Sequence, residues 1–242
     1  AGRILIRMVR NSMKIFKIRS RNPLGDRMFF SLLGLIEEED RKQILRYRFW
    51  QDRQRSLLGH LLSRYAVIKE YNLTNKDIRI RRHTYGKPYI KDYSQIHYNI
   101  SHSGEWIVCV VDSSIVGIDI QEHRGAKNSL AKYYFSPREQ NYLFSLEKDE
   151  QSVAFYDLWS MKEAYIKATG RGLSQPLDKF SIVQEGEDFC SVVEKEKKYF
   201  LRRYQIENGY SLAVCSQTRW FCSSLIELTI EAMLPAFKES RC

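Results

Sequence analysis

Two acidic residues and a lysine are the side chains of this sequence best suited to metal and phosphate chemistry. Asp119 ends the apolar stretch Gly117-Ile-Asp-Ile120, and Glu163 stands four residues before Lys167 in a segment with helical spacing. Residues four apart lie on the same face of a helix. Two carboxylates on rigid elements beside a lysine suit a magnesium ion that carries phosphate groups. Taken singly, Asp119 is better explained as a turn cap, and Glu163 with Lys167 as a surface ion pair.

Further candidates for phosphate contacts occur in the first half of the chain. The segment Asn99-Ile-Ser-His-Ser-Gly104 places His102 beside Ser101, although a histidine that bonds only turn backbone fits equally well. Lys87 lies in the stiff turn Gly86-Lys87-Pro88, which lacks the spaced glycines of a phosphate-binding P-loop. A helical face carries four arginines, of which Arg55 is the best functional candidate; they stand at positions 46, 48, 53 and 55.

The elements that position these residues alternate between helices and strands. Helical spacing predicts helices over residues 37–47, 52–71 and 149–169, and Ser136, Pro137 and Glu139 predict a capping box that begins another. Gly170 is expected to end the helix at residue 169. Strands are expected at 78–81, 97–101, 105–111, 115–120, 180–183, 199–206 and 210–215, with an edge strand over 15–18. The sequence therefore predicts an α+β protein of two related halves, residues 13–112 and 113–242.

Composition sets limits on the class of protein. With 43% hydrophobic residues the chain can bury a core, and its formal net charge of +10 favours anionic partners. The five cysteines form no C-x-x-C pair, which is typical of reduced thiols in a cytoplasmic protein. No apolar run reaches the about 18 residues that a membrane span requires. Residues 1–12 are basic and lack the apolar centre of a signal peptide, so we interpret them as an added upstream extension.

Together these segments resemble the 4′-phosphopantetheinyl transferases, specifically the larger type that activates surfactin synthetase and other nonribosomal peptide synthetases. The resemblance covers about residues 13 to 215. Its four motifs occur in order, as Tyr85-Gly-Lys-Pro88, Asn99-Ile-Ser-His-Ser-Gly104, Gly117-Ile-Asp-Ile120, and Trp159-Ser-Met-Lys-Glu-Ala164 followed by Lys167 and Gly170-x-Gly-Leu173. Each motif alone is weak, whereas four in order are specific.

The resemblance implies a reaction and a role for each candidate. The family moves phosphopantetheine from coenzyme A to a serine of a carrier protein and releases adenosine 3′,5′-bisphosphate. Asp119 and Glu163 would hold Mg²⁺, Glu163 would draw the proton from the serine, and Lys167 would neutralise charge on the leaving oxygen. The phosphates of coenzyme A would contact Lys87, Ser101 and His102, with Arg55 and Ser56 near the adenosine end. The implied fold is a pseudo-dimer of two similar α+β halves with the active site in the cleft between them.

One position departs from the pattern of many relatives. Two residues after Asp119 they carry a second acid, whereas this chain has Gln121. An amide contributes no charge, so we expect Gln121 to contact the metal weakly or through water, and the site to bind magnesium less tightly than three acids would.

The partner implied by the resemblance is an acidic carrier protein or carrier domain, which agrees with the basic net charge. We expect it to dock on the segment His123 to Tyr134, which contains Arg124, Lys127, Lys132, Tyr133 and Tyr134. Individual residues there also fit an ordinary solvated loop. We further expect a cytoplasmic monomer that binds neither nucleic acid nor membrane.

Two alternatives stay open at the level of sequence. A magnesium-dependent nuclease would also use basic charge with Asp119, Glu163 and Lys167, although common nuclease sites place the lysine two residues after the acid on a strand. A module that binds acidic carriers without catalysis is the other alternative, and it would have no use for this set together with His102.

Overall fold

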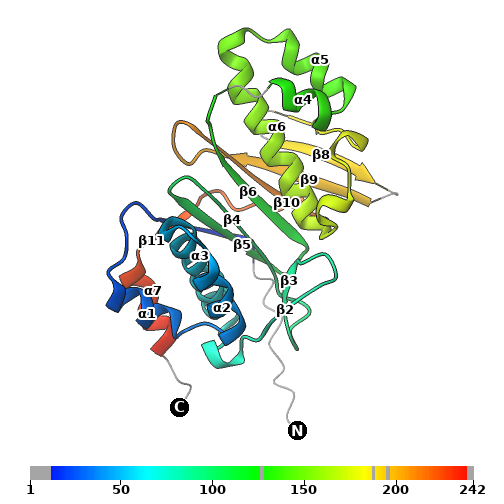
Figure 1. Cartoon of the computed structure of the whole chain (residues 1–242). Coiled ribbons are helices and arrows are strands. Elements are labelled where there is room, and N and C mark those ends of the chain that lie inside the picture. Colours follow the sequence, from blue (N-terminus) through cyan, green and yellow to red (C-terminus); the bar gives the residue numbers. More distant parts are fainter. Residues whose placement is uncertain (1–11, 126–127, 187–188, 195–196, 239–242) are drawn as a thin grey trace.

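Each half of the chain forms a sheet covered by one long helix (Figure 1). The computed structural model describes residues 12–125, 128–186, 189–194 and 197–238. Among these, the first sheet has the order β11-β1-β5-β4 and the second the order β6-β10-β9-β8-β7. The α+β class and the two-half architecture expected from the sequence are therefore confirmed.

The first half is built around helix α3 (Trp50–Tyr71), whose leucines pack on the four-stranded sheet. Its strands are β1 (Lys14–Arg19), β4 (His97–Ser103), β5 (Trp106–Asp112) and β11 (Ile226–Leu228). Three more helices belong to this half, namely α1 (Asp26–Leu33), α2 (Glu38–Arg46) and α7 (Ile230–Lys238). A separate hairpin is formed by β2 (Ile80–Arg82) and β3 (Pro88–Ile90).

The second half is built around helix α6 (Lys148–Thr169), which covers the five-stranded sheet. The strands are β6 (Val116–Glu122), β7 (Val183–Gln184), β8 (Phe189–Glu194), β9 (Lys197–Tyr204) and β10 (Tyr210–Ser216). Helices α4 (Asn128–Tyr134) and α5 (Pro137–Ser145) precede α6. No helix of the described residues is long and apolar enough to cross a membrane.

Alternation along the strands produces three cores. Ile107 and Cys109 of β5 face helix α3, whereas Trp106, Val108 and Val110 face a cluster that they share with β6 and β10. In β6, the residues Val116, Ile118 and Ile120 face that shared cluster. The residues between them, including Asp119, therefore point to the opposite side of the strand. The two halves thus share one apolar interface, and Asp119 lies on the other face.

Local signals predicted helix ends well. Ser136 accepts a hydrogen bond from the backbone N–H of Glu139, and Glu139 accepts one from the N–H of Ser136, which is the expected capping box. Gly170 ends α6 in the left-handed conformation with φ of 70°. Both predictions are confirmed.

Three expectations about strands differ from the structure. Strand β1 is an interior strand, because β11 pairs with its free side. Of the residues expected as a strand over 180–183, only Val183 is in a strand, β7, and the carbonyl of Phe180 accepts a hydrogen bond from the buried ammonium of Lys162. Finally, β11 and α7 return to the first half, so a division into 13–112 and 113–242 does not describe the last segment. The expected extension at residues 1–12 lies, except for Ser12, outside the described residues.

Candidate functional site

Asp119 is the centre of a buried polar cluster at the boundary between the halves. It lies on β6 and is 2% exposed. Its Oδ1 accepts hydrogen bonds from the ammonium of Lys167 at 2.6 Å and from Ser101 Oγ at 2.9 Å. Its Oδ2 accepts one from Gln121 Nε2 at 2.8 Å. Three donors thus hold the carboxylate in one orientation, and the turn-cap interpretation of Asp119 does not apply.

Helix α6 carries Glu163 and Lys167 to the same cluster. The ammonium of Lys167 bonds Asp119 and also donates to Ser101 Oγ at 2.9 Å, so it is engaged across elements. Burial raises the pKa of Glu163, and the nearby negative charge of Asp119 raises it further, while Lys167 opposes both. Two carboxylates that raise one another's energy in this way favour a bound cation.

The close approach of α6 to β6 depends on a glycine. A Cβ at Gly117 would overlap the backbone of Ala164 and Ala168 on α6. Any larger residue would therefore separate the helix from the strand. Gly117 is what allows Lys167 to reach Asp119 from the helix.

A pocket of about 390 Å³ opens beside this cluster, between α3 and β4. It is lined by seven of the predicted site residues together with Gly59, His60 and Ile100; the seven are Arg55, Ser56, Ser101, His102, Asp119, Gln121 and Lys167. Burial lowers the pKa of His102, and the positive charges of Arg55 and Lys167 lower it further. Three basic side chains around one pocket favour an anionic ligand.

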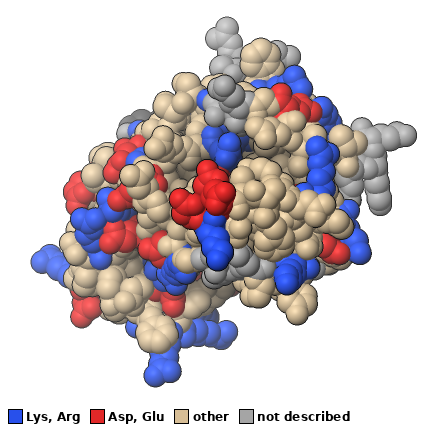
Figure 2. All heavy atoms as spheres, turned by 90° about the horizontal axis from the view of Figure 1, so that it is seen from above, with Lys and Arg blue, Asp and Glu red and all other residues tan. Residues whose placement is uncertain are grey.

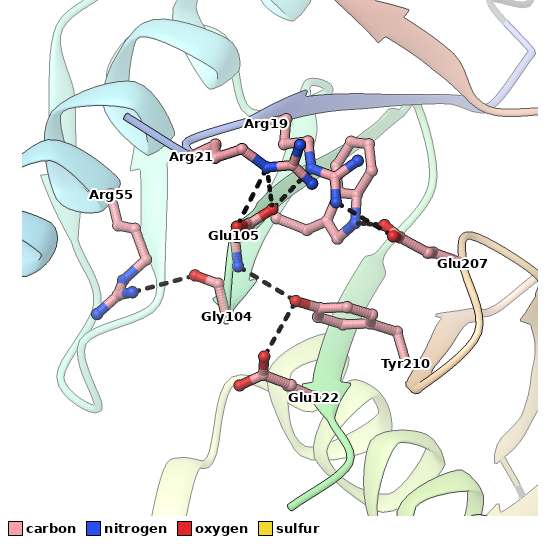
Figure 3. Close-up of polar contacts among 9 residues, drawn as sticks. Arg19, Arg21, Arg55, Gly104, Glu105, Glu122, Glu207 and Tyr210 are labelled. Carbon is pink, nitrogen blue, oxygen red and sulfur yellow. Dashed lines mark hydrogen bonds and ion pairs between the residues drawn. The ribbon is translucent and has the colours of Figure 1, made fainter. Parts of the chain in front are cut away.

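Arg55 is held in a defined orientation at the pocket. One nitrogen of its guanidinium donates to the carbonyl of Gly104 at 3.0 Å, and the other donates to Asp52 at 2.7 Å. The first contact joins helix α3 to the turn between β4 and β5, as Figure 3 shows. Arg55 is thus the member of the predicted arginine face that reaches the site.

Lys87 differs from its predicted role as a phosphate contact. Its ammonium donates to the carbonyl of Val116 at 3.0 Å and to that of Ala168 at 2.7 Å. Its stem packs over Gly170. Burial lowers the pKa of Lys87 to about 8. The structure therefore does not bring Lys87 into the pocket, because the carbonyls at the end of α6 and the start of β6 take its hydrogens.

The magnesium ligands expected from the sequence fit the residues that the structure brings together. Among the described residues, no group of three or more His, Cys, Asp or Glu gathers around one point. Asp119 lines the pocket, Glu163 lies close enough for its charge to interact with that of Asp119, and Gln121 takes the third position with its nitrogen toward Asp119. Two carboxylates with free space beside them suit Mg²⁺, which keeps several waters and takes substrate phosphate oxygens.

The segment expected to dock a carrier protein is mainly helical rather than a loop. His123 stacks on Tyr156 at 4.8 Å and bonds Ser211 Oγ at 2.8 Å. Helix α4 follows and exposes Tyr133 by 76% and Tyr134 by 41%. Lys132 is exposed, and Lys127 lies outside the described residues. Figure 2 shows basic side chains spread over several parts of the face seen there, with acidic ones among them.

Sequence reasoning missed two kinds of residue at the site. His60 lies four residues after Ser56 on α3, and this spacing would have placed it at the pocket. Asn99 and Ser103 lie two residues on either side of Ser101 on β4, so alternation places all three on one face. Both signals are present in the sequence once the elements are known.

Comparisons with known proteins agree over both halves. The profile of the 4′-phosphopantetheinyl transferase superfamily matches residues 115–215, and the profile described as 4′-phosphopantetheinyl transferase, N-terminal, matches residues 22–114. The chain is similar to 4′-phosphopantetheinyl transferase Sfp of Bacillus subtilis (strain 168), with 37% identity over 92% of this chain and 100% of that protein.

Two further relatives show the same likeness. The 4′-phosphopantetheinyl transferase psf-1 of Bacillus pumilus is 34% identical over 92% of this chain and 97% of its own length. The 4′-phosphopantetheinyl transferase gsp of Aneurinibacillus migulanus is 35% identical over 81% of this chain and 82% of its own. The similarity therefore covers at least 82% of the length of each of these three proteins.

Proposed function

The chain belongs to the 4′-phosphopantetheinyl transferase superfamily, and from that premise we propose how its own residues carry out the family's reaction. The family transfers 4′-phosphopantetheine from coenzyme A to carrier proteins. The observation that carries the proposal is the cluster in which Lys167 of one half bonds both Asp119 and Ser101, next to a pocket lined by Arg55 and His102. Acid, base and anion-binding groups meet there.

We propose that Asp119 and Glu163 hold Mg²⁺, with Gln121 contributing through water or a weak contact. When bound, the ion would polarise the diphosphate of coenzyme A and neutralise part of its charge. Burial raises the pKa of Glu163 and the negative charge of Asp119 raises it further, which supports this site because a bound cation would offset the repulsion between the two carboxylates. The missing third acid supports a lower affinity for the ion.

The pocket would take the phosphates of coenzyme A. Arg55 and His102 supply donors from the first half, and Ser56 and Ser101 supply hydroxyls. The pKa of His102 is lowered by burial and by two positive neighbours. A phosphate beside it would reverse the effect of those neighbours and favour the protonated, donating form.

In the transfer step, the oxygen of the carrier serine forms a bond to the phosphorus on the pantetheine side. The bond from that phosphorus to the bridging oxygen breaks, and adenosine 3′,5′-bisphosphate leaves with the electron pair. Glu163 accepts the serine proton, directly or through one water. Lys167 stabilises the charge that develops on the leaving oxygen.

The acceptor is proposed to be an acidic carrier domain of a peptide, polyketide or fatty-acid synthase. Helix α4 supports this, because it presents Tyr133, Tyr134 and Lys132 to solvent on the half that carries the metal ligands. Apolar rings beside positive charge suit an acidic partner with an apolar contact surface. We also propose that the protein acts as a cytoplasmic monomer, with Cys109 and Cys215 as buried, reduced thiols.

The direct test is incubation of the protein with coenzyme A, Mg²⁺ and apo carrier proteins of several kinds. We expect a mass gain on the carrier equal to one phosphopantetheine group, together with release of adenosine 3′,5′-bisphosphate. No gain with any carrier, from protein that circular dichroism shows to be folded, would refute the proposal. Omission of Mg²⁺ tests the metal separately, and we expect the gain to disappear.

A further inference from the structure

Strands β4 and β6 are edges of different sheets, yet side chains join them in a regular series. The strands run side by side in the same direction, and every second side chain of β4 accepts a hydrogen bond from every second N–H of β6. The three bonds are Ile118 N to Asn99 Oδ1 at 2.9 Å, Ile120 N to Ser101 Oγ at 3.3 Å, and Glu122 N to Ser103 Oγ at 2.9 Å. We call this series the β4–β6 seam. The constant offset fixes the position of one strand along the other.

The end of the seam continues directly into the residue that orients Arg55. After Ser103, the chain turns at Gly104, whose carbonyl accepts from Arg55. Figure 3 shows this turn lying between Arg55 of α3 and two residues of the second half, Glu122 and Tyr210. A Cβ at Gly104 would overlap Tyr210 Oη, and the φ of 55° is left-handed, so a glycine is required.

The seam separates two groups of site residues that are each rigid on their own. Asp119, Glu163 and Lys167 all belong to the second half, and Gly117 allows their strand and helix to pack closely. Arg55, Ser56 and His102 all belong to the first half. Displacement of β6 along β4 would therefore keep the residues of each group together and change the spacing between the groups, together with the bonds that Ser101 makes to Asp119 and Lys167 across the seam.

We propose that Asn99 and Ser103 are positioning residues for the transfer reaction. They align two sets of side chains, the acid group of the second half (Asp119, Glu163 and Lys167) and the cofactor-binding group of the first half (Arg55, Ser56 and His102). The inference rests on the proposed function of those two groups. Ser101 belongs to the same seam, but it also bonds Asp119 and Lys167. A substitution of Ser101 would therefore not distinguish lost alignment from a lost direct contact. Asn99 is 6% exposed and its oxygen is the acceptor of Ile118 N–H, which makes it the buried end of the seam.

The test compares variants that remove an acceptor with variants that keep it. Ser103→Ala and Asn99→Leu remove the acceptor, whereas Ser103→Thr and Asn99→Asp keep an oxygen in place. Ser63→Ala is the matched control, because the hydroxyl of Ser63 is buried in α3, donates to the carbonyl of His60 and takes no part in the seam. For each protein, kcat and KM for coenzyme A are measured with an apo carrier, along with the dissociation constants of Mn²⁺ alone and of adenosine 3′,5′-bisphosphate alone.

We expect Ser103→Ala and Asn99→Leu to lower kcat by about fivefold, the size of one lost hydrogen bond. Ser103→Thr should stay within about twofold of the parent, as should Ser63→Ala. Mn²⁺ and the bisphosphate should bind all variants within about twofold, because each group keeps its own geometry.

Three results would overturn the inference. One is an unchanged kcat in Ser103→Ala, and a second is the same loss in Ser63→Ala, since both would show that alignment is not the cause. A third is weakened Mn²⁺ binding in the seam variants, which would place the damage inside the acid group. Absence of transfer by the parent protein would instead refute the proposed function and this inference with it. If Asn99→Leu fails to fold, the half-buried Ser103 pair decides the question alone.

Discussion

The two groups of side chains that meet at the pocket are stabilised in different ways. Asp119 of the second half has three hydrogen-bond donors, one of which is Ser101 of the first half, and the ammonium of Lys167 is already paired with it. In the first half, Arg55 and His102 lie around open space, and the pKa of His102 is depressed by burial and by the positive charges of Arg55 and Lys167. The acid group is therefore preorganised, whereas the positive charge of the cofactor-binding group is neutralised only when an anion binds. Substitutions of Asp119, Glu163 or Lys167 in the second half should change turnover. Substitutions of Arg55 or His102 in the first half should change the affinity for coenzyme A.

Glu163→Gln is the most severe way to break this contrast. The variant removes the proposed base and one metal ligand, and we expect kcat to fall by about 10³-fold, within the range of general-base catalysis. KM for coenzyme A should change by less than about threefold, because the pocket keeps its cations. Steady-state transfer to an apo carrier measures both. Glu150→Gln, an exposed substitution near the start of the same helix, is the control and should leave both constants unchanged.

The same variant also separates lost chemistry from lost folding. The pKa of Glu163 is raised in the folded state, so its contribution to stability is present at low pH and is lost as pH rises through that raised value. At neutral pH the charged carboxylate therefore costs stability, and Glu163→Gln should be more stable than the parent by up to about 1 kcal/mol in metal-free buffer. Urea unfolding at pH 7 and at pH 4 checks this, and a variant less stable at pH 7 would contradict it.

Lys167→Ala tests the acid group through its cation. We expect kcat to fall about 10²-fold, since one charge-stabilising donor is removed from the transition state. Mg²⁺ should still activate, because its carboxylate ligands remain, and Asp119 without its ammonium partner should if anything favour the ion. Lys148→Ala at the exposed start of α6 is the control. A variant that loses affinity for coenzyme A but keeps kcat would place Lys167 with the cofactor-binding group instead.

Arg55→Ala makes the corresponding change in the first half, with a smaller expected effect. KM for coenzyme A should rise about tenfold while kcat changes by less than about threefold, because a contact made equally in ground and transition states is lost. Arg53→Ala is a close control, since Arg53 lies two residues away and its guanidinium donates to the carbonyl of Tyr47, outside the pocket. Equal effects of the two variants would show that general positive charge, rather than the oriented guanidinium of Arg55, attracts the cofactor.

What could be predicted from the sequence depended on how local the signal was. The capping box at Ser136 and the left-handed glycine at 170 involve neighbours along the chain, and both were predicted correctly. The pairing of β11 with β1 joins residues about 200 positions apart, and nothing near residue 226 reveals it. The strand predicted at residues 15–18 is confirmed, but its predicted position at the edge of the sheet was wrong for this reason.

The candidate site shows the same limit. Helical spacing put Glu163 and Lys167 on one face, but it could not show that Lys167 bonds Asp119 from another element. The order of several motifs supplied that association. Lys87 shows the limit of prediction from motifs. Its motif predicted a phosphate contact, but in the folded protein the carbonyls of Val116 and Ala168 accept the hydrogens of its ammonium.

Lys87 provides the last and smallest test, because it lies in the first half and its ammonium donates to backbone carbonyls of the second. Lys87→Met keeps the packing stem over Gly170 and removes the donor. If Lys87 only joins the halves, KM for coenzyme A should change by less than about twofold, whereas a phosphate contact would raise it as Arg55→Ala does. The pH dependence of stability gives an independent readout. The pKa of Lys87 is lowered to about 8 by burial, below its ordinary value of 10.5, so the folded state loses this proton before the unfolded state does.

The sign of that linkage follows directly. Between pH 8 and 10.5 the unfolded chain binds more protons at Lys87 than the folded one, so the free energy of unfolding gains a positive contribution as pH rises through this range. In Lys87→Met this contribution should be absent, and the difference in stability between the two proteins should change by about 1 kcal/mol or more across the window, which urea unfolding can resolve. A parallel pH profile of the two proteins would mean that Lys87 is not held among the carbonyls of Val116 and Ala168. The role as a phosphate contact would then regain support, and the boundary between the two groups would have to be drawn with Lys87 on the cofactor side.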